Sequence, residues 1–136
     1  MQTYWVLWSI KESSYKAWQR HTKSKPIFNP IHFRVRSQCI LSKNNLTSIV
    51  QTDGFSFNVD TEFSDEYVYS YCHLPEASHL ILPFTQFNSY LKGLKDKGLV
   101  LQKSTSNVPH LLELKTQTKR PLSLSHDGRF CAINYV

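Results

Sequence analysis

The sequence predicts an α+β protein whose sheet is mostly antiparallel and whose two helices lie near residues 12–21 and 85–97. Three observations favour this class. Segments of β-branched and aromatic residues recur along the chain, Asp-Gly steps at 53–54 and 127–128 mark hairpins, and one segment near residue 90 has a helical apolar stripe. The order of elements, strand and helix, several strands, then helix and more strands, is typical of α+β proteins.

The N-terminal segment predicts a strand followed by a short helix. Residues 3–10 are rich in β-branched and aromatic side chains, which favours a central strand. The helix follows at 12–21, where Ser13 or Ser14 could cap its start. Two prolines after it indicate a loop.

Residues 31–41 alternate in polarity, which predicts a half-exposed strand. Its more apolar face has Ile31, Phe33, Val35, Ser37, Cys39 and Leu41. Its other face has His32, Arg34, Arg36, Gln38 and Ile40. The strand therefore offers a row of basic and polar groups to solvent.

The middle of the chain predicts a hairpin and a further strand. Residues 46–52 and 55–59 flank Asp53-Gly54, a dipeptide whose two positions favour the positive φ of a two-residue turn. After an acidic loop, residues 67–73 predict another strand that ends before Pro75.

The segment from Phe84 to Gly98 gives the clearest helix signal. Apolar side chains recur at helical spacing, Thr85 could cap the start, lysines favour the carboxyl end, and Gly98 suits the position after it. Strands are then expected at 99–102, 111–118, 122–125 and 129–136.

The length of 136 residues fits a single domain, 1–136, without internal repeats or a convincing linker. No basic segment followed by a long apolar run opens the chain, so we expect no signal peptide and no membrane span. The expected compartment is the cytoplasm, or the nucleus in a eukaryote. The three scattered cysteines predict reduced thiols rather than disulfides.

Charge is segregated along the chain. Residues 1–50 have eight Lys or Arg against one acid, residues 51–80 have six acids and no Lys or Arg, and residues 81–120 have seven Lys or Arg against two acids. A fold that joins the two basic blocks would present a cationic face to a polyanion.

The cationic strand face predicts a nucleic-acid site. Residues two apart on a strand lie about 6.6 Å apart, close to the spacing of phosphates along a single nucleic-acid strand. The candidate binding residues are His32, Arg34, Arg36, Gln38, Lys92, Lys95, Lys115, Lys119 and Arg120. A solvated sheet face that carries arginines for solubility is the simpler interpretation of the same pattern.

Other chemistry has little support in the sequence. Glu113-Leu114-Lys115 resembles the Glu-x-Lys of restriction-type, metal-dependent nucleases, but the residues just before it, 99–108, have no acid to complete such a site. Cys72, His73 and His79 lack the further pair that a zinc site needs. We therefore expect no catalytic residue, no metal and no cofactor.

Two segments of the C-terminal half have local resemblances to known families. Residues 87–114 resemble the recognition helix and wing of winged-helix DNA-binding proteins, without the two upstream helices of that fold. Residues 122–136 look like a strand-turn-strand of a β-propeller blade, although the chain has no repeats. They are also similar to the hairpin that closes the guide-RNA-binding wedge domain of transposon-encoded RNA-guided nucleases, a resemblance that favours RNA.

The sequence thus predicts a small, basic, non-catalytic protein that binds nucleic acid, with RNA or single strands favoured over duplex grooves. The alternative is a protein-interaction module, such as an inhibitor, an immunity protein or a subunit of a larger protein or nucleoprotein complex, because the acidic block gains nothing from phosphates. In that alternative an exposed Trp5, Trp8 or Trp18 would anchor the interface, although burial is expected for most of the three.

Overall fold

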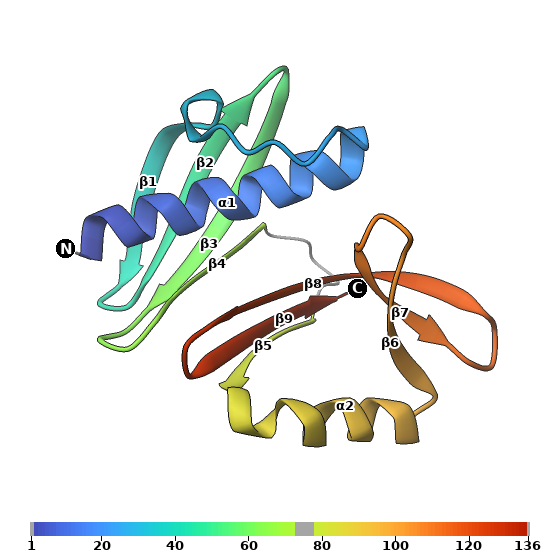
Figure 1. The fold of residues 1–136 in the computed structure, drawn as a ribbon. Helices are drawn as coiled ribbons and strands as arrows, with labels where there is room; N and C mark the ends of the chain where they lie inside the picture. The colour runs from blue at the N-terminus through green and yellow to red at the C-terminus, as the bar shows by residue number, and fades with distance from the viewer. Residues whose placement is uncertain (1, 73–77, 136) are drawn as a thin grey trace. The chain divides into compact units, whose positions relative to one another are not determined.

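The computed structural model describes residues 2–72 and 78–135, and the chain divides into two compact units, Met1–Leu74 and Pro75–Val136 (Figure 1). The described residues form two α-helices and nine strands in two antiparallel sheets, which confirms the α+β class. Each unit has its own cluster of buried hydrophobic side chains. Whether the two units unfold together as a single domain stays a prediction.

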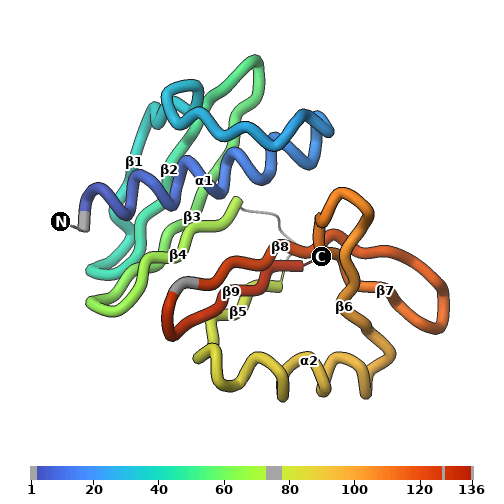
Figure 2. The backbone as a smooth tube through the Cα atoms, in the orientation of Figure 1, coloured from blue at the N-terminus to red at the C-terminus, as the bar shows by residue number. Residues whose placement is uncertain are grey.

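Unit 1 is a four-stranded antiparallel sheet with one long helix on one face. Its elements are α1 (Gln2–Thr22), the 3-10 helix η1 (Pro30–His32), β1 (Arg34–Ser42), β2 (Asn45–Thr52), β3 (Phe55–Phe63) and β4 (Val68–Cys72). The strands lie in the order β1-β2-β3-β4, and α1 runs across the sheet against β2, β3 and β4 (Figures 1 and 2).

The core of unit 1 forms where α1 meets the sheet. Val6 and Ile10 from α1 are buried in one cluster with Val50 and Val59 from the central strands. Full burial of one such side chain stabilises the fold by roughly 1.5–3 kcal/mol. Small polar side chains are also buried in unit 1, and among them Thr61 and Ser70 share a hydrogen bond of 2.8 Å.

The strand expected at residues 3–10 is wrong, because these residues form the first half of α1. Val6, Ile10 and Ser14 lie four residues apart and are all buried, so the helical conformation places one continuous stripe against the sheet. That packing overrides the strand preference of the β-branched and aromatic residues. The expected helix 12–21 is the second half of α1, and Ser14 donates within it to Ile10 O at 2.9 Å rather than capping a start.

The strand expected at 31–41 begins later and has no buried face. Residues 30–32 form η1, whose first turn is capped by Asn29, and β1 runs from Arg34 to Ser42. Only Val35 of β1 is half-buried, and the other eight residues are exposed. The expected apolar inner face therefore does not form, and Phe33, just before β1, reaches the core instead.

The hairpin predicted at Asp53-Gly54 is confirmed. It joins β2 to β3, and the two turn residues have φ values of 41° and 81°. The strand expected at 67–73 is observed as β4, Val68–Cys72, with His73 outside the described residues.

Unit 2 packs one helix against a five-stranded antiparallel sheet. Its elements are β5 (Ser78–Pro83), the 3-10 helix η2 (Phe84–Gln86), α2 (Phe87–Asp96), β6 (Leu99–Lys103), β7 (Pro109–Glu113), β8 (Thr118–Asp127) and β9 (Phe130–Tyr135). The strand order is β5-β9-β8-β7-β6 (Figure 1). Leu94 of α2 joins Leu111, Leu122 and Ile133 of the sheet in the core.

The predicted helix is confirmed in unit 2, with different ends. Thr85 lies in η2, so it does not cap α2, while Gly98 has the expected positive φ of 79°. The strand expected at 111–118 is wrong, because β7 ends at Glu113 and a turn precedes β8. β5 was not expected at all.

Replacing a core residue of α1 tests the packing of unit 1. Ile10 is completely buried, so Ile10→Ala should lower the free energy of unfolding by about 2–5 kcal/mol through lost burial and a residual cavity. Tyr4→Ala is the matched control, because Tyr4 is on the same helix and 82% exposed, and it should change stability by less than about 0.5 kcal/mol. Urea unfolding measures both, and equal effects of the two variants would contradict the packing.

Candidate interaction surfaces

A β-bulge decides which side chains of β1 share a face. Arg34 lies opposite Gln51 and Val35 opposite Val50, but the next aligned pair is Ser37 with Ile49, so Arg36 is an extra residue. An extra residue inverts the alternation beyond it.

The predicted stripe of four basic and polar groups is therefore split. Arg34 shares its face with Gln51, whereas Gln38 lies opposite Ser48, which is buried on the side of α1. His32 lies in η1, outside the strand. The expectation that these residues form one row is wrong, and their role in binding stays a prediction.

Two arginines nevertheless come together on the face of the sheet opposite α1, which we call the open face. Arg36 donates from Nε to Oε1 of Gln51 at 2.9 Å, and Gln51 is the cross-strand neighbour of Arg34. Both arginines are exposed. Because Arg36 uses only Nε in this bond, the Nη donors of its guanidinium fork remain to bind an anion.

The part of the open face formed by β3 and β4 is acidic and aromatic. Asp60 and Glu62 of β3 lie opposite Tyr71 and Tyr69 of β4, and the hydroxyl of Tyr67 donates to Glu62. The rings of Tyr69 and Tyr71 are 5.5 Å apart. Part of the acidic block thus lies on the same face as the two arginines, so the open face is cationic on β1 and acidic on β3.

Large apolar side chains are exposed at the N-terminal end of α1. Tyr4, Trp5 and Trp8 are 82%, 63% and 47% exposed, and we call these three the aromatic patch. Tyr4 and Trp8 are four residues apart and so lie on one side of the helix. The rings of Trp8 and Phe28 form an edge-to-face contact, with their centroids 5.2 Å apart. Trp5 and Trp8 are thus not core residues, contrary to the expectation, while Trp18 is half-buried.

Aliphatic side chains of unit 1 are exposed as well. The segment before β1 lies beside α1, where Nζ of Lys11 donates to Pro30 O at 3.0 Å, and Ile27 and Ile31 of that segment are 73% and 75% exposed. Ile40 and Leu41 at the end of β1 are also exposed. The sequence carries no signal for their exposure, since an aliphatic side chain in a strand pattern is ordinarily part of a core.

The basic residues of the second block lie in unit 2 and do not form one row. Lys92 and Lys95 are exposed on α2, and Lys115 lies in the turn whose Leu114 N donates to Gly98 O at 2.8 Å, just beyond that helix. Lys119 and Arg120 are neighbours on β8 and point to opposite faces. Arg120 pairs with Glu113 at 3.2 Å.

The Glu-x-Lys motif has an ordinary structural role. Glu113 accepts hydrogen bonds from Thr116 at 3.0 Å and from Arg120, and these bonds lower the pKa of its carboxyl group. Within residues 2–72 and 78–135, no three His, Cys, Asp or Glu side chains gather where a metal ion could bind. The motif therefore closes the β7–β8 turn in the structure.

The cysteine and histidine group offers no reactive thiol. Cys72 donates from Sγ to Ser13 O at 3.5 Å, and burial raises the pKa of its thiol to about 12. His79 is exposed on β5, and His73 lies outside the described residues. At neutral pH the Cys72 thiol is protonated and therefore a weak nucleophile.

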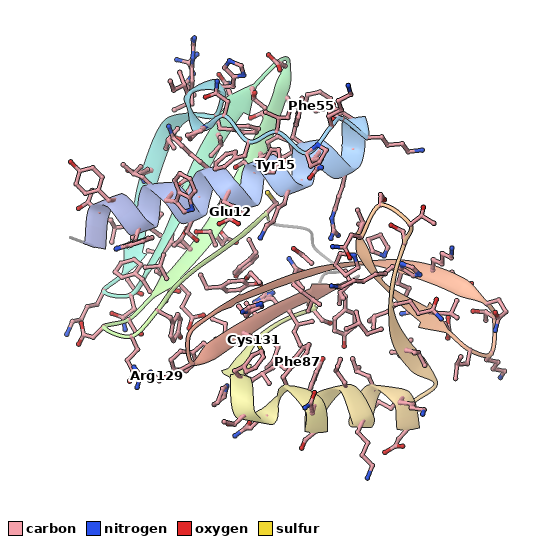
Figure 3. All side chains as sticks on the ribbon, viewed as in Figure 1. Glu12, Tyr15, Phe55, Phe87, Arg129 and Cys131 are labelled. Atoms are coloured by element: carbon pink, nitrogen blue, oxygen red, sulfur yellow. The ribbon has the colours of Figure 1, made fainter. Side chains whose placement is uncertain are left out.

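Comparison with protein-family models, with curated proteins and with solved structures found no match for this chain. None of the helices described is both long and apolar enough to span a membrane. Residues 87–114 form α2 and the hairpin β6–β7, and β8 pairs with β9, while the resemblances stated for these segments stay predictions. Figure 3 shows the described side chains on the ribbon, with Glu12 and Tyr15 labelled on α1.

The Tyr67–Glu62 contact predicts a pH dependence. The hydrogen bond to Glu62, followed by burial, raises the pKa of Tyr67 from 10.0 to about 12, so its contribution to stability is full below pH 10 and is lost as the pH rises towards 12. Glu62→Gln should return the titration midpoint of Tyr67 towards 10, and Asp65→Asn, in the neighbouring loop, should leave it unchanged. NMR of ¹³C-labelled tyrosine measures both midpoints; an unshifted Tyr67 in Glu62→Gln would contradict the contact.

Proposed function

We propose that the protein is a non-catalytic interaction module that binds a protein partner through unit 1. The observation that carries this proposal is the placement of exposed apolar side chains. Of the twelve large hydrophobic side chains exposed among the described residues, eight lie between residues 4 and 49. Exposed apolar side chains that gather, as Tyr4, Trp5 and Trp8 do on α1, mark interaction sites, and tryptophan and tyrosine are enriched among the residues that dominate binding energy.

The charge around these side chains indicates the kind of partner. Residues 1–50 have eight Lys or Arg against Glu12 alone, and Glu12 is paired within α1 to Lys16 at 3.1 Å. An acidic partner would gain Coulomb attraction and faster association, and its apolar side chains would cover the exposed isoleucines. Aliphatic side chains do not stack on bases, so the exposed isoleucines favour a protein partner over nucleic acid.

Removing the aromatic patch tests the proposal. Wild type, a Trp5→Ser/Trp8→Ser variant and a Phe84→Ser control serve as bait in nuclease-treated lysate of the source organism. Phe84 is also 47% exposed but lies in unit 2, so the control removes an exposed ring elsewhere. We expect wild type and control to retain the same protein, and the double variant to lose it at least about tenfold, since truncating one central anchor costs 2 kcal/mol or more. Equal retention by all three baits would refute the proposal.

Nucleic-acid binding is the second candidate function, because Arg34 and Arg36 both reach the open face beside Gln51. Two guanidinium groups on one face of a strand could hold neighbouring phosphates of a single strand. Four other candidates, Lys92, Lys95, Lys115 and Lys119, are exposed in unit 2, where their charge would attract a polyanion to that unit. The acidic carboxylates of β3 on the same face weigh against this candidate.

Fluorescence polarisation with a labelled single-stranded RNA measures the second candidate. If it is correct, affinity should fall steeply with salt, and Arg34→Glu/Arg36→Glu should abolish binding. The control is Lys23→Glu/Lys25→Glu, an equal change of charge at exposed positions before β1. Identical loss in both variants would indicate a diffuse field rather than a site, and binding by neither wild type nor control would exclude this function.

A further inference from the structure

We infer that the edge strand β1 is a docking edge, to which an extended acidic segment of the partner adds as a fifth strand. This inference rests on the proposed function. Such β-augmentation obtains affinity from main-chain hydrogen bonds and specificity from the side chains beside them.

β1 lies at the edge of its sheet. In the sheet of unit 1, β1 pairs with β2 on one side and is the outermost strand on the other. It is nine residues long, and eight of the nine are exposed. A strand at a sheet edge presents a row of N–H and C=O groups that can pair with another chain. The other edge, β4, is only five residues long and has no exposed residue.

The irregularities of β1 limit where pairing can occur. One register shift lies between Val35 and Ser37, and the second lies between Ile40 and Ser42. Bulges at an edge disrupt pairing with an arbitrary strand. The regular run between them, Ser37–Ile40, is therefore the segment to which a short extended peptide can pair.

The ends of β1 differ in chemistry, and this difference sets the partner and its direction. Arg34 and Arg36 precede the regular run, while Ile40 and Leu41 lie at its other end, and neither β1 nor β2 contains an acid. A complementary segment has carboxylates beside the arginines and apolar side chains beside Ile40 and Leu41. Antiparallel pairing is the slightly more stable arrangement, so the segment is apolar first and acidic last along its own chain.

The charges of β1 also favour an acidic peptide over a second copy of this chain. Two β1 strands paired antiparallel would set Arg36 beside Ile40 and would supply no carboxylate to either arginine. An RNA strand would engage the arginines but would leave the backbone edge and Ile40 unused. An acidic extended peptide uses all three features.

A synthetic peptide tests the inference without knowledge of the natural partner. The probe is fluorescein-labelled Val-Val-Thr-Thr-Thr-Glu-Glu with blocked ends, titrated with the full chain and followed by fluorescence polarisation. We expect saturable binding that Arg34→Glu/Arg36→Glu weakens at least about tenfold, because the acidic end then meets like charge. The control Lys23→Glu/Lys25→Glu should retain affinity within about threefold, since those lysines lie outside β1.

Two modified peptides separate strand addition from simple charge attraction. The reversed sequence has the same composition but presents its acids at the wrong end, and should bind at least about tenfold more weakly. N-methylation at alternate residues removes the donors on one edge of the peptide, so one methylation pattern should abolish binding and the other should leave it intact. Equal binding of all peptides would overturn the inference.

The remaining outcomes are decisive as well. Absence of saturable binding up to about 1 mM would overturn strand addition. So would a wild-type dimer in sedimentation equilibrium that Arg34→Glu/Arg36→Glu dissociates, or displacement of the peptide by single-stranded RNA at equal concentration. If circular dichroism shows that the Glu variant is unfolded, Arg34→Gln/Arg36→Gln replaces it. If the peptide does not bind but wild type still captures a protein that the Trp5→Ser/Trp8→Ser variant loses, strand addition is wrong and the proposed function stands. If the peptide binds but all baits retain protein equally, only the proposed function is refuted.

Discussion

The packing of α1 against one face of its sheet is the contact on which unit 1 depends. Val6 and Ile10 are buried with Val50 and Val59, and this single layer gives the sheet a covered face and an open face. It also determines what remains exposed. Once α1 turns its apolar stripe towards β2, β3 and β4, the rings of its first two turns lie outside the core, and β1 lies at the margin of the covered area.

The exposure and irregular pairing of β1 follow from its position at the margin of the area that α1 covers. Because α1 covers little of β1, an apolar inner face on this strand would gain little from burial. The burial of β1 accordingly does not alternate, and its pairing with β2 contains two register shifts. Arg34 and Arg36 both reach the open face, and the bulge at Arg36 turns Gln38 away from them. The acids of β3 lie two strands away on the open face. The segregated charge of the sequence therefore corresponds, within unit 1, to a sheet face with a cationic edge and an acidic interior.

The sequence allowed prediction wherever a local signal was sufficient. The Asp53-Gly54 turn and the helix before Gly98 depend on positive φ and on helical spacing, both of which are local properties. The helix at residues 3–10 was missed because its conformation depends on packing against strands far along the chain. The bulge at Arg36 has no signature in residue type, so the predicted row of four polar groups could not be corrected from the sequence. Exposure of Trp5 and Ile40 likewise depends on where α1 lies.

Amide hydrogen exchange along β1, resolved by NMR, measures whether β1 is an uncovered edge of a sheet held by α1. If it is, every second amide between Ser37 and Ile40 exchanges rapidly, because its N–H points away from β2, while the amides of Ser48 and Val50 within the sheet are protected. Uniform slow exchange along β1 in the isolated chain would contradict it, because the edge would then be covered.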